Sequence, residues 1–500
     1  MAPRARRPAR LRPPVRRKAA GRSTRSSRGP LPSERAAAIR AQARRGRVED
    51  LTPLLVALSD PVPGVRQTAA IALGLLADPR AATTLAAALQ DPDPAVRGSV
   101  AEALGPAGRP DTRTALESAL SDPDAHVRRK AADALGSASD PGSVAVLAAC
   151  CLDSTAEVRL AVARTLGRIG TPDAHLALEG LLADLSDRVR REAVLGLGRA
   201  GRPEVLRLVR AMLDDPSRRV RAAAAVISGR LHDRDALPRL LEILTQKETW
   251  EKPSVLVALG RIGDRSAVPA LVQAAESPQH WLRVCAVHAL GELGGDEARA
   301  AALRGLTDTA WPVRGAAAIA LGAVGTPDDL TRLLDLLEDD HPWPRRGATY
   351  ALGHLGLAAA APRIREELAD PTPEVRLAAV WAAGRLGDDG AREDLVRLLR
   401  SGPCLESGPA PDTEDEVLRS DAESRLFDAI VQALGRLPHG ADDPVVQAAL
   451  LAARARLPDE ELDRLARLPL PEVGDDRPVP TLRSLFEVAI VTPYDEDSAG

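Results

Sequence analysis

Residues 91–108 read DPDPAVRGSVAEALGPAG, and this stretch decides the fold because it recurs every 31 residues without an insertion. Arg97 is taken as position zero of the unit, and a glycine, here Gly105, follows it at position +8. The residues at position zero in the other copies are Arg66, Arg128, Arg159, Arg190, Arg221, Lys252, Arg283, Arg314, Arg345 and Arg376. Eleven copies at one interval indicate a stack of structural repeats.

Each unit has the pattern of a helical hairpin. Apolar residues recur at positions −1, +3, +4, +6 and +7, which lie on one side of a helix at about 100° per residue. A second helix, such as residues 80–90, precedes each Asp-Pro, where the proline ends one helix and begins the turn. The glycine three residues after each Leu-Gly pair, such as Gly108, is expected to form a left-handed C-cap. One hairpin cannot bury its own apolar side, so the units must stack.

The unit D-P-x-x-x-V-R-x-x-A-x-x-A-L-G-x-x-G resembles the short HEAT repeat of the phycobilisome-lyase type over residues 33 to 460. The resemblance implies an all-α fold, a right-handed α-solenoid of about twelve 31-residue hairpins. It also implies that the Asp at position −6 and the Arg at position zero form a structural ladder, and an anion-binding rail is the alternative. The predicted ladder residues include Asp60, Arg66, Asp91, Arg97, Asp122, Arg128, Asp215, Arg221, Asp370 and Arg376.

Charge divides the chain into segments. Residues 1–47 hold 16 Arg and Lys against one acid, and the remainder holds 51 against 69, so a basic arm of +15 precedes a body of −18. The predicted organisation is a disordered basic arm (1–30), a solenoid with an N-terminal capping helix (31–400), an acidic loop (401–424), a last repeat with capping helices (425–470) and a tail (471–500). The arm is expected to contact a polyanion, a membrane surface or the body itself.

Composition limits the class of protein. Aromatic residues make up only 2% of the chain against 45% hydrophobic residues, which excludes a large aromatic-centred core. The four cysteines form neither a disulfide framework nor a zinc motif. No secretory signal or membrane span is predicted. The cysteine usage favours a reducing cytoplasm. The excess of Arg over Lys suggests a bacterial coding bias, and a monomer is expected.

A stripe of polar positions (+1, +2, +5 and +9) is expected on the exposed side of the first helix of each unit. Five arginines share position +9, and stacked helices would set them at intervals of about 8–10 Å, suited to an acidic peptide or a phosphate backbone. The alternative is that arginine at +9 simply stabilises a helix C-terminus. These arginines are Arg168, Arg199, Arg230, Arg261 and Arg385.

Aromatic residues occur unevenly, since no Trp precedes residue 250. Three tryptophans stand at position −2 and one at −3, while three units carry His, Tyr or Trp at +5, where earlier units carry Glu102 or Asp133. Trp and Tyr beside Arg are typical of binding hot spots; the alternative is that the Trp residues pack against the next helix. The candidates are Trp250, Trp281, His288, Trp311, Trp343, Tyr350 and Trp381.

An enzyme is disfavoured because catalytic or metal-binding motifs are absent from the sequence. Deoxyhypusine hydroxylase binds iron with His-Glu pairs, and none of the eight His is followed by Glu. Cys285 and His288 share a helix face but lack a third partner. We therefore predict a scaffold without cofactor, metal or catalytic residues that binds a protein partner, acidic in part, on the concave face. The alternatives are nucleic-acid binding through residues 1–30 and a lyase or hydroxylase.

Overall fold

The computed structural model describes residues 31–43, 50–105, 110–199, 201–246, 251–401, 429–430, 432–434 and 436–437. The chain divides into two compact units, Met1–Ala119 (unit 1) and Leu120–Gly500 (unit 2). Every regular element in the described residues is a helix, which confirms the all-α solenoid fold. The predicted segments 1–30 and 471–500 lie outside the described residues, as do Trp250, the predicted acidic loop 401–424 apart from Ser401, and most of the predicted segment 425–470.

Unit 1 begins with the single helix that the sequence predicts as a cap. This helix, α1, packs against α3, and α3 packs against α5. The helices of unit 1 are α1 (Pro32–Ala43), α2 (Thr52–Ala57), α3 (Pro63–Leu76), α4 (Ala82–Ala88), α5 (Pro94–Leu104) and α6 (Pro110–Ala119).

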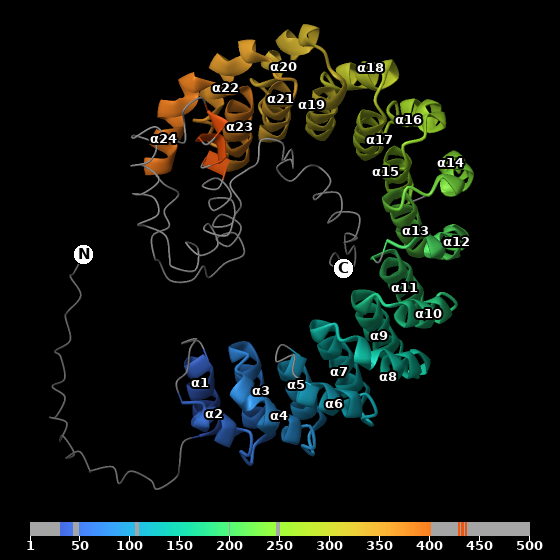
Figure 1. The fold of residues 1–500 in the computed structure, drawn as a ribbon, viewed down its shortest axis with the longest axis vertical. Coiled ribbons are helices and arrows are strands. Elements are labelled where there is room, and N and C mark those ends of the chain that lie inside the picture. Colours follow the sequence, from blue (N-terminus) through green and yellow to red (C-terminus); the bar gives the residue numbers. More distant parts are fainter. Residues whose placement is uncertain are drawn as a thin grey trace, which may run out of the picture. The chain divides into compact units, whose positions relative to one another are not determined.

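Unit 2 has two layers of helices (Figure 1). The first-layer helices carry position zero, and each packs against the next. They are α7 (Ala125–Ala138), α9 (Ala156–Ile169), α11 (Asp187–Arg199), α13 (Arg218–Arg230), α15 (Lys252–Ile262), α17 (His280–Leu293), α19 (Trp311–Val324), α21 (Pro342–His354) and α23 (Pro373–Leu386). Within unit 2 they lie along the inner side of a curved row.

The second-layer helices lie along the outer side of the same row (Figure 1). A three-residue 3-10 turn leads into most of them, as Pro141–Ser143 does before α8. They are α8 (Val144–Ala149), α10 (Pro172–Leu181), α12 (Leu206–Ala211), α14 (Leu237–Thr245), α16 (Val268–Ala274), α18 (Asp296–Gly305), α20 (Leu330–Leu336), α22 (Ala361–Glu367) and α24 (Arg392–Ser401).

Local sequence explains where the first-layer helices begin and end. In α5, Asp93 accepts hydrogen bonds from the backbone N–H groups of Ala95 and Val96, and Pro94 starts the first turn. At the C-terminal end of another first-layer helix, α9, Gly170 adopts a left-handed conformation with φ of 65°. The same C-cap position is left-handed in Ala77 and Ser139, although neither is glycine. The helix end is therefore set by the stacking of the repeat as well as by the glycine.

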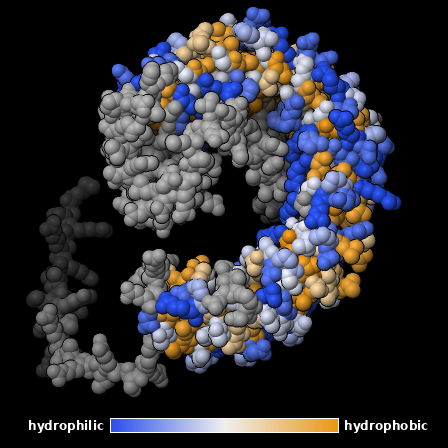
Figure 2. All heavy atoms as spheres, in the orientation of Figure 1, coloured by the Kyte–Doolittle hydropathy of each residue, from blue (hydrophilic) through white to orange (hydrophobic). Residues whose placement is uncertain are grey.

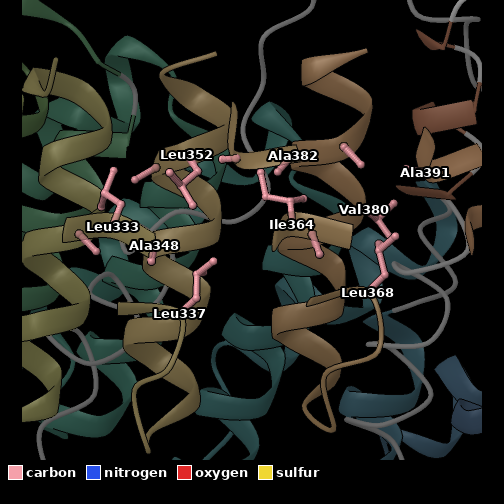
Figure 3. Close-up of a cluster of buried hydrophobic side chains, with 14 of the residues drawn as sticks. Leu333, Leu337, Ala348, Leu352, Ile364, Leu368, Val380, Ala382 and Ala391 are labelled. Atoms are coloured by element: carbon pink, nitrogen blue, oxygen red, sulfur yellow. The ribbon is translucent and has the colours of Figure 1, made fainter. Parts of the chain in front are cut away.

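The core lies between the two layers. In α9 the residues at −1, +3, +4, +6 and +7 are all buried, as the pattern predicts. They are Val158, Val162, Ala163, Thr165 and Leu166. Leucine and isoleucine side chains of the second layer, such as Leu333 and Ile364, pack against small first-layer residues such as Ala348 and Ala382 (Figure 3). Small residues on the first layer let the helices lie close together, and the larger ones fill the space behind them.

The glycine at +8 is a point of contact between repeats. A Cβ added to Gly229 would lie 2.6 Å from Ala258 Cα, and one added to Gly260 would lie 2.8 Å from Ala289 Cα. Each alanine stands at +6 of the next first-layer helix. The recurring glycine therefore serves a close backbone approach, a role that the sequence alone did not separate from a turn.

One sequence expectation about this layer is wrong. Position +2 was expected on the exposed stripe, but the residues there are buried in most repeats, among them Ser99, Cys285 and Ala316. The reason is the same close approach, because a first-layer helix contacts neighbours on two sides and its own second-layer helix on a third. The stripe is thereby narrowed to positions +1, +5 and +9.

Most arginines at position zero make two kinds of hydrogen bond. Arg66 donates from Nη1 to the backbone oxygen of Asp60 in its own repeat, and from Nε and Nη2 to the carboxylate of Asp91 in the next. Arg97 and Arg376 donate to the backbone oxygens of Asp91 and Asp370 in the same way. The pairs between successive repeats, at 2.6–2.9 Å, are Arg35–Asp60, Arg66–Asp91, Arg128–Asp153, Arg159–Asp184, Arg190–Asp215, Arg283–Asp308, Arg314–Asp339 and Arg345–Asp370.

Two repeats depart from this arrangement. Gln246 replaces the aspartate that would follow Arg221, and Arg221 instead donates to Glu251, which is buried. In the next repeat Lys252 stands at position zero and Ser277 replaces the aspartate. No ion pair joins Lys252 to a carboxylate among the described residues, so the ladder is interrupted at α15.

Substitution of a +8 glycine tests the close approach. Gly229→Ala places a Cβ against the Ala258 backbone and should cost about 1–3 kcal/mol. Gly180→Ala is the matched control, since Gly180 is also next to the last residue of its helix but an added Cβ would meet nothing within 4 Å. Helix propensity alone should stabilise that variant by up to about 1 kcal/mol. Urea unfolding measures both, and an equal shift in both variants would contradict the contact.

The ladder predicts a pH-dependent loss of stability. Burial raises the pKa of Asp339, but hydrogen bonds from Arg314 and the His341 backbone outweigh it, so the pKa stays below its ordinary value. The stabilisation is therefore present above about pH 4 and is lost as pH falls through the lowered pKa. Asp339→Asn keeps the acceptor for His341 but removes the charge, and should cost about 1–3 kcal/mol at pH 7.

The difference between wild type and Asp339→Asn should shrink at acid pH, as followed by urea unfolding between pH 3 and pH 7. Glu157→Gln removes one partner of an exposed pair with Arg188 at 3.9 Å and is the control. Its effect should stay below about 0.5 kcal/mol at every pH. A pH-independent loss in Asp339→Asn would show that packing, not charge, accounts for the effect.

Candidate functional site

The candidate site residues occupy two rows along the first-layer helices of unit 2. Position +5 falls in the middle of each helix, and on α17, α19, α21 and α23 it carries His288, Ile319, Tyr350 and Trp381, all half-buried. These four residues are called the aromatic face. Positions −2 and −3 fall in the first turn, and there Trp281, Trp311 and Trp343 form what is called the tryptophan row. Sequence analysis treated the two rows as one surface.

The aromatic face centres on a stacked pair of rings. Tyr350 of α21 and Trp381 of α23 stack with centroids 4.7 Å apart and planes 15° from parallel. The Arg385 guanidinium lies 5.8 Å from the Trp381 ring centroid. The His354 ring lies 5.9 Å from the Tyr350 ring, and its Nδ1 lies 3.0 Å from the Gly322 backbone oxygen. Two helices thus present three rings as a single π-rich surface beside the Arg385 guanidinium.

The structure separates Trp343 from the other members of its row. A Cβ added to Gly315 would meet the Trp343 indole, so the ring rests on this glycine of α19. The ring also packs on a small core of Val284, Val313 and Ala316. Trp343 therefore has the packing role that sequence analysis gave as the alternative, while one side of the ring still faces Arg346, whose Cζ lies 5.2 Å from its centroid.

Trp281 and Trp311 are more open. Their side chains are 40% and 42% exposed, which makes them the exposed tryptophans of the described chain. The Trp311 ring stacks on His341 of the next repeat with centroids 3.7 Å apart. His341 also holds the N-terminus of α21, where its Nδ1 accepts a hydrogen bond from the backbone N–H of Trp343. The row is thereby tied to the turns that begin the helices.

Burial shapes the electrostatics of the arginine between the rows. Burial lowers the pKa of Arg346 from its ordinary value, and nearby Glu374 opposes this effect. The guanidinium remains charged, since even a lowered arginine pKa lies far above neutrality. A partly desolvated cation over an indole interacts more strongly than an exposed one. Arg346 thus connects the tryptophan row with the aromatic face along α21.

The arginines at +9 differ in their contacts, and four of the five are exposed. Arg199 donates to Glu192 at 3.0 Å, and its guanidinium crosses Gly167 of the preceding helix. Arg168 crosses Gly136 in the same way and is exposed. Arg230 is exposed, and Arg261 is half-buried. A band of hydrophilic residues follows the inner side of unit 2 over α11 to α15 (Figure 2). The first four +9 arginines lie on α9 to α15, before the aromatic face, whereas Arg385 lies on α23 beside Trp381.

The cysteine and histidine that share a face of α17 do not form a catalytic pair. Cys285 is buried, and burial raises the pKa of its thiol to about 12. A thiol is a nucleophile only as the thiolate, which this pKa removes at neutral pH. Among the described residues, no group of three His, Cys, Asp or Glu side chains could hold a metal ion. None of the described helices has the length and apolar character needed to cross a membrane.

Sequence reasoning missed two residues that shape the site. Gly315 occupies +1, where other repeats carry Arg129, Arg191 or Arg346, and this loss of a side chain makes room for the Trp343 ring. His341 precedes Pro342 at the helix start and pairs with Trp311. A glycine at a position that is large elsewhere was the available signal for the first residue. The second had no signal, because ring stacking across repeats depends on the helix spacing.

A family model for HEAT repeats matches seven overlapping segments of the chain: residues 25–104, 82–158, 115–191, 175–252, 252–311, 286–353 and 333–403. The matches confirm the HEAT-repeat resemblance derived from the 31-residue unit. No curated protein sequence matches the chain.

Solved structures agree on the fold. Yeast importin-β is 13% identical over 86% of this chain and 64% of its own, with a TM-score of 0.53. The phycocyanin lyase CpcE–CpcF complex from Nostoc is 24% identical over 45% of this chain and 92% of its own, with a TM-score of 0.30. Human deoxyhypusine hydroxylase is 24% identical over 55% of this chain and 95% of its own, with a TM-score of 0.24. At 13% identity the likeness to importin-β shows the fold alone.

Members of the tryptophan row should differ in how much stability is lost when the ring is removed. Trp343→Ala removes a ring that packs on Gly315 and should cost about 3 kcal/mol, whereas Trp281→Ala removes an exposed ring and should cost about 1 kcal/mol or less. Gly315→Ala should reproduce much of the Trp343→Ala loss, because its methyl group occupies the ring's position. Thermal unfolding of the three variants measures this. Equal losses for the two Trp→Ala variants would contradict the separation of roles.

Proposed function

This chain belongs to the HEAT-repeat family, and we propose that it is a non-catalytic scaffold that binds an acidic segment of a partner protein on the aromatic face. The observation that carries the proposal is the stacked Tyr350–Trp381 pair, half-exposed and flanked by Arg385. Large rigid rings beside an arginine are the side chains that dominate binding energy at protein interfaces.

The rings supply affinity at low entropic cost. Stacking fixes Tyr350 and Trp381 before a partner arrives, so little side-chain freedom is lost on binding. Trp381 also lies close to Gly353, where an added Cβ would be 3.0 Å from the indole. A face held in this way favours a preformed site over one that rearranges. Ile319 and His288 extend it across the two preceding repeats.

The charges select the partner's chemistry. Arg385 lies 5.8 Å from the centroid of the Trp381 ring, and Arg346, which precedes Tyr350 on α21, lies 5.2 Å from the centroid of the Trp343 ring. A carboxylate of the partner can receive paired hydrogen bonds from either guanidinium while apolar side chains of the partner cover the rings. The favoured partner is therefore a segment in which acidic residues flank large apolar ones.

The site chemistry supports a binding function over a catalytic one. The buried Cys285 thiol lies under the same helix face but stays protonated at neutral pH. The neighbouring ring, His288, has no deprotonated thiol to serve as its partner in nucleophilic catalysis. The ladder arginines are already bonded to aspartates, so they serve the stack and not a substrate.

The proposal is tested by placing a photo-crosslinking residue at Ile319, inside the aromatic face, and isolating its adducts from the native cell. Arg385→Glu should lower the yield of an acidic-segment partner by about tenfold or more, because it replaces attraction by repulsion. Arg304→Glu on α18 is the matched control, since it makes the same charge change at an exposed second-layer residue. Equal yields in the two variants would refute binding at the aromatic face.

A further inference from the structure

Four consecutive first-layer helices of unit 2 carry an arginine at position +9, at or next to the last residue of the helix. These residues are called the arginine row, and they are Arg168 of α9, Arg199 of α11, Arg230 of α13 and Arg261 of α15. Each of these helices packs against the next, at an interval of about 8–10 Å. The row therefore offers one guanidinium group per repeat along the inner side of unit 2, where Figure 2 shows a band of hydrophilic residues over α11 to α15.

The glycines at +8 give guanidinium groups of the row room to lie across the preceding helix. A Cβ added to Gly136 would lie 3.1 Å from Nη1 of Arg168, and one added to Gly167 would lie 3.0 Å from Nη1 of Arg199. Both side chains thus bridge from their own helix to the one before it. An arginine that only stabilised the C-terminus of its own helix would not need this crossing. The cations therefore follow the stack of repeats and not the axes of single helices.

Arginine and apolar side chains fill the inner positions of these repeats. Positions +1, +5 and +9 of α9 to α15 hold six arginines and no Asp or Glu, a formal charge of +6. The same positions of α17 to α23 hold Arg346 and Arg385 against Glu292, a formal charge of +1. The apolar residues among the inner positions of α9 to α15 are Leu160, Leu195, Ala222, Val226, Pro253 and Val257. Positive charge on the inner side of unit 2 is therefore concentrated before the aromatic face.

The carboxylates closest to the arginine row do not neutralise it. Glu192 is buried and accepts a hydrogen bond from Nη2 of Arg199 at 3.0 Å. Asp133 pairs with Arg164, at +5 of α9, also at 3.0 Å. Arg168 forms no ion pair with any residue that the structure describes. The row thus retains a net positive charge for a ligand to meet.

The half-buried Arg191, at +1 of α11, adds to this positive field. Burial lowers the pKa of its guanidinium, and nearby Glu192 opposes this effect. The like charge of Arg219, in the next repeat, lowers the pKa as well. The group stays charged, because even a lowered arginine pKa lies far above neutrality. A partly desolvated cation interacts with a carboxylate more strongly than an exposed one, so an anionic ligand is favoured beside these two arginines.

The apolar side chains between the arginines favour a peptide over a nucleic acid. Leu195 and Val226 stand at +5 of α11 and α13 and are half-buried, which suits contact with apolar side chains of a peptide. Single-stranded nucleic acids are held largely by bases stacked on aromatic rings, and positions +1, +5 and +9 of α9 to α15 carry no aromatic residue. The charge of −18 over residues 48–500 also opposes the approach of a long polyanion.

The spacing of the arginine row selects a conformation of the ligand. A polyproline II segment has three residues per turn and rises about 3.1 Å per residue, so every third residue recurs at about 9 Å. This interval matches the spacing of about 8–10 Å between neighbouring helices. Alternate side chains of a β-strand lie only about 7 Å apart. An extended segment with an acidic residue at every third position therefore places one carboxylate at each arginine.

We propose that the arginine row binds an extended acidic segment of a partner protein in which Asp or Glu stands at every third residue. Each carboxylate pairs with one guanidinium of the row, and the residues between them contact Leu195 and Val226. The site lies on α9 to α15, whereas the aromatic face lies on α17 to α23. The proposal therefore does not rest on the proposed function, and either one holds without the other.

The test measures binding of a fluorescein-labelled peptide of five Glu-Pro-Ser repeats to the full chain by fluorescence anisotropy. Arg168→Gln combined with Arg230→Gln should weaken binding about fivefold or more at low ionic strength, because two of the ion pairs are lost. Both arginines are exposed and lie outside the ladder, so the stack is kept. A peptide of the same composition with its Glu residues in one block should bind wild type about threefold more weakly, because its charges do not match the spacing.

The matched control combines Arg207→Gln with Arg234→Gln, which makes the same charge change at exposed residues on the outer side of unit 2 and should bind the peptide as wild type does. Equal losses in the two double variants would reduce the effect to net charge and overturn the proposal. Equal binding of the two peptides would overturn it as well. A loss in Arg385→Gln in place of the first double variant would move the peptide to the aromatic face, and tighter binding of an oligothymidine of the same charge would assign the row to nucleic acid; either result overturns the proposal.

Discussion

The closeness of neighbouring first-layer helices is the constraint on which the other features depend. Between Gly229 and Ala258, or Gly260 and Ala289, the backbones approach so nearly that a single added methyl group would overlap the next helix. This contact fixes the interval and the register of the repeats. It also removes position +2 from solvent and leaves positions +1, +5 and +9 as the surface of the inner side. Every row of side chains on that side inherits its spacing from this one contact.

The arginine ladder follows from the same register. With the helices this close, the guanidinium at position zero reaches the aspartate of the next repeat while bonding to the backbone of its own turn. Two repeats are thereby connected by a charge-assisted fork whose geometry admits one alignment. The exceptions are instructive. Glu251 supplies the missing carboxylate to Arg221. In the following pair both members are replaced, the arginine by Lys252 and the aspartate by Ser277. Between α15 and α17 the close approach of Gly260 to Ala289 remains.

From the sequence we can predict the structural features that every 31-residue unit shares. The helix that carries position zero, its buried positions and the left-handed C-cap at Gly170 all follow from periodicity and local backbone preference. The aspartate partner required more, because the pairing runs 25 residues forward and depends on how the hairpins stack. The packing of the Trp343 ring on Gly315 could not be predicted in this way, because both residues depart from the consensus of the repeat. Periodicity describes what repeats share, and the candidate site consists of what they do not.

Packing and binding are therefore compatible roles for the aromatic residues. Trp343 lies on Gly315 and Trp381 lies against Gly353, so in both cases a glycine of the preceding helix supports one side of the ring. An arginine of the same helix, Arg346 or Arg385, also lies near each ring. A ring that is supported in this way is ordered before any ligand arrives, which lowers the entropic cost of binding. The packing that stabilises the late repeats thus also prepares their surface for recognition.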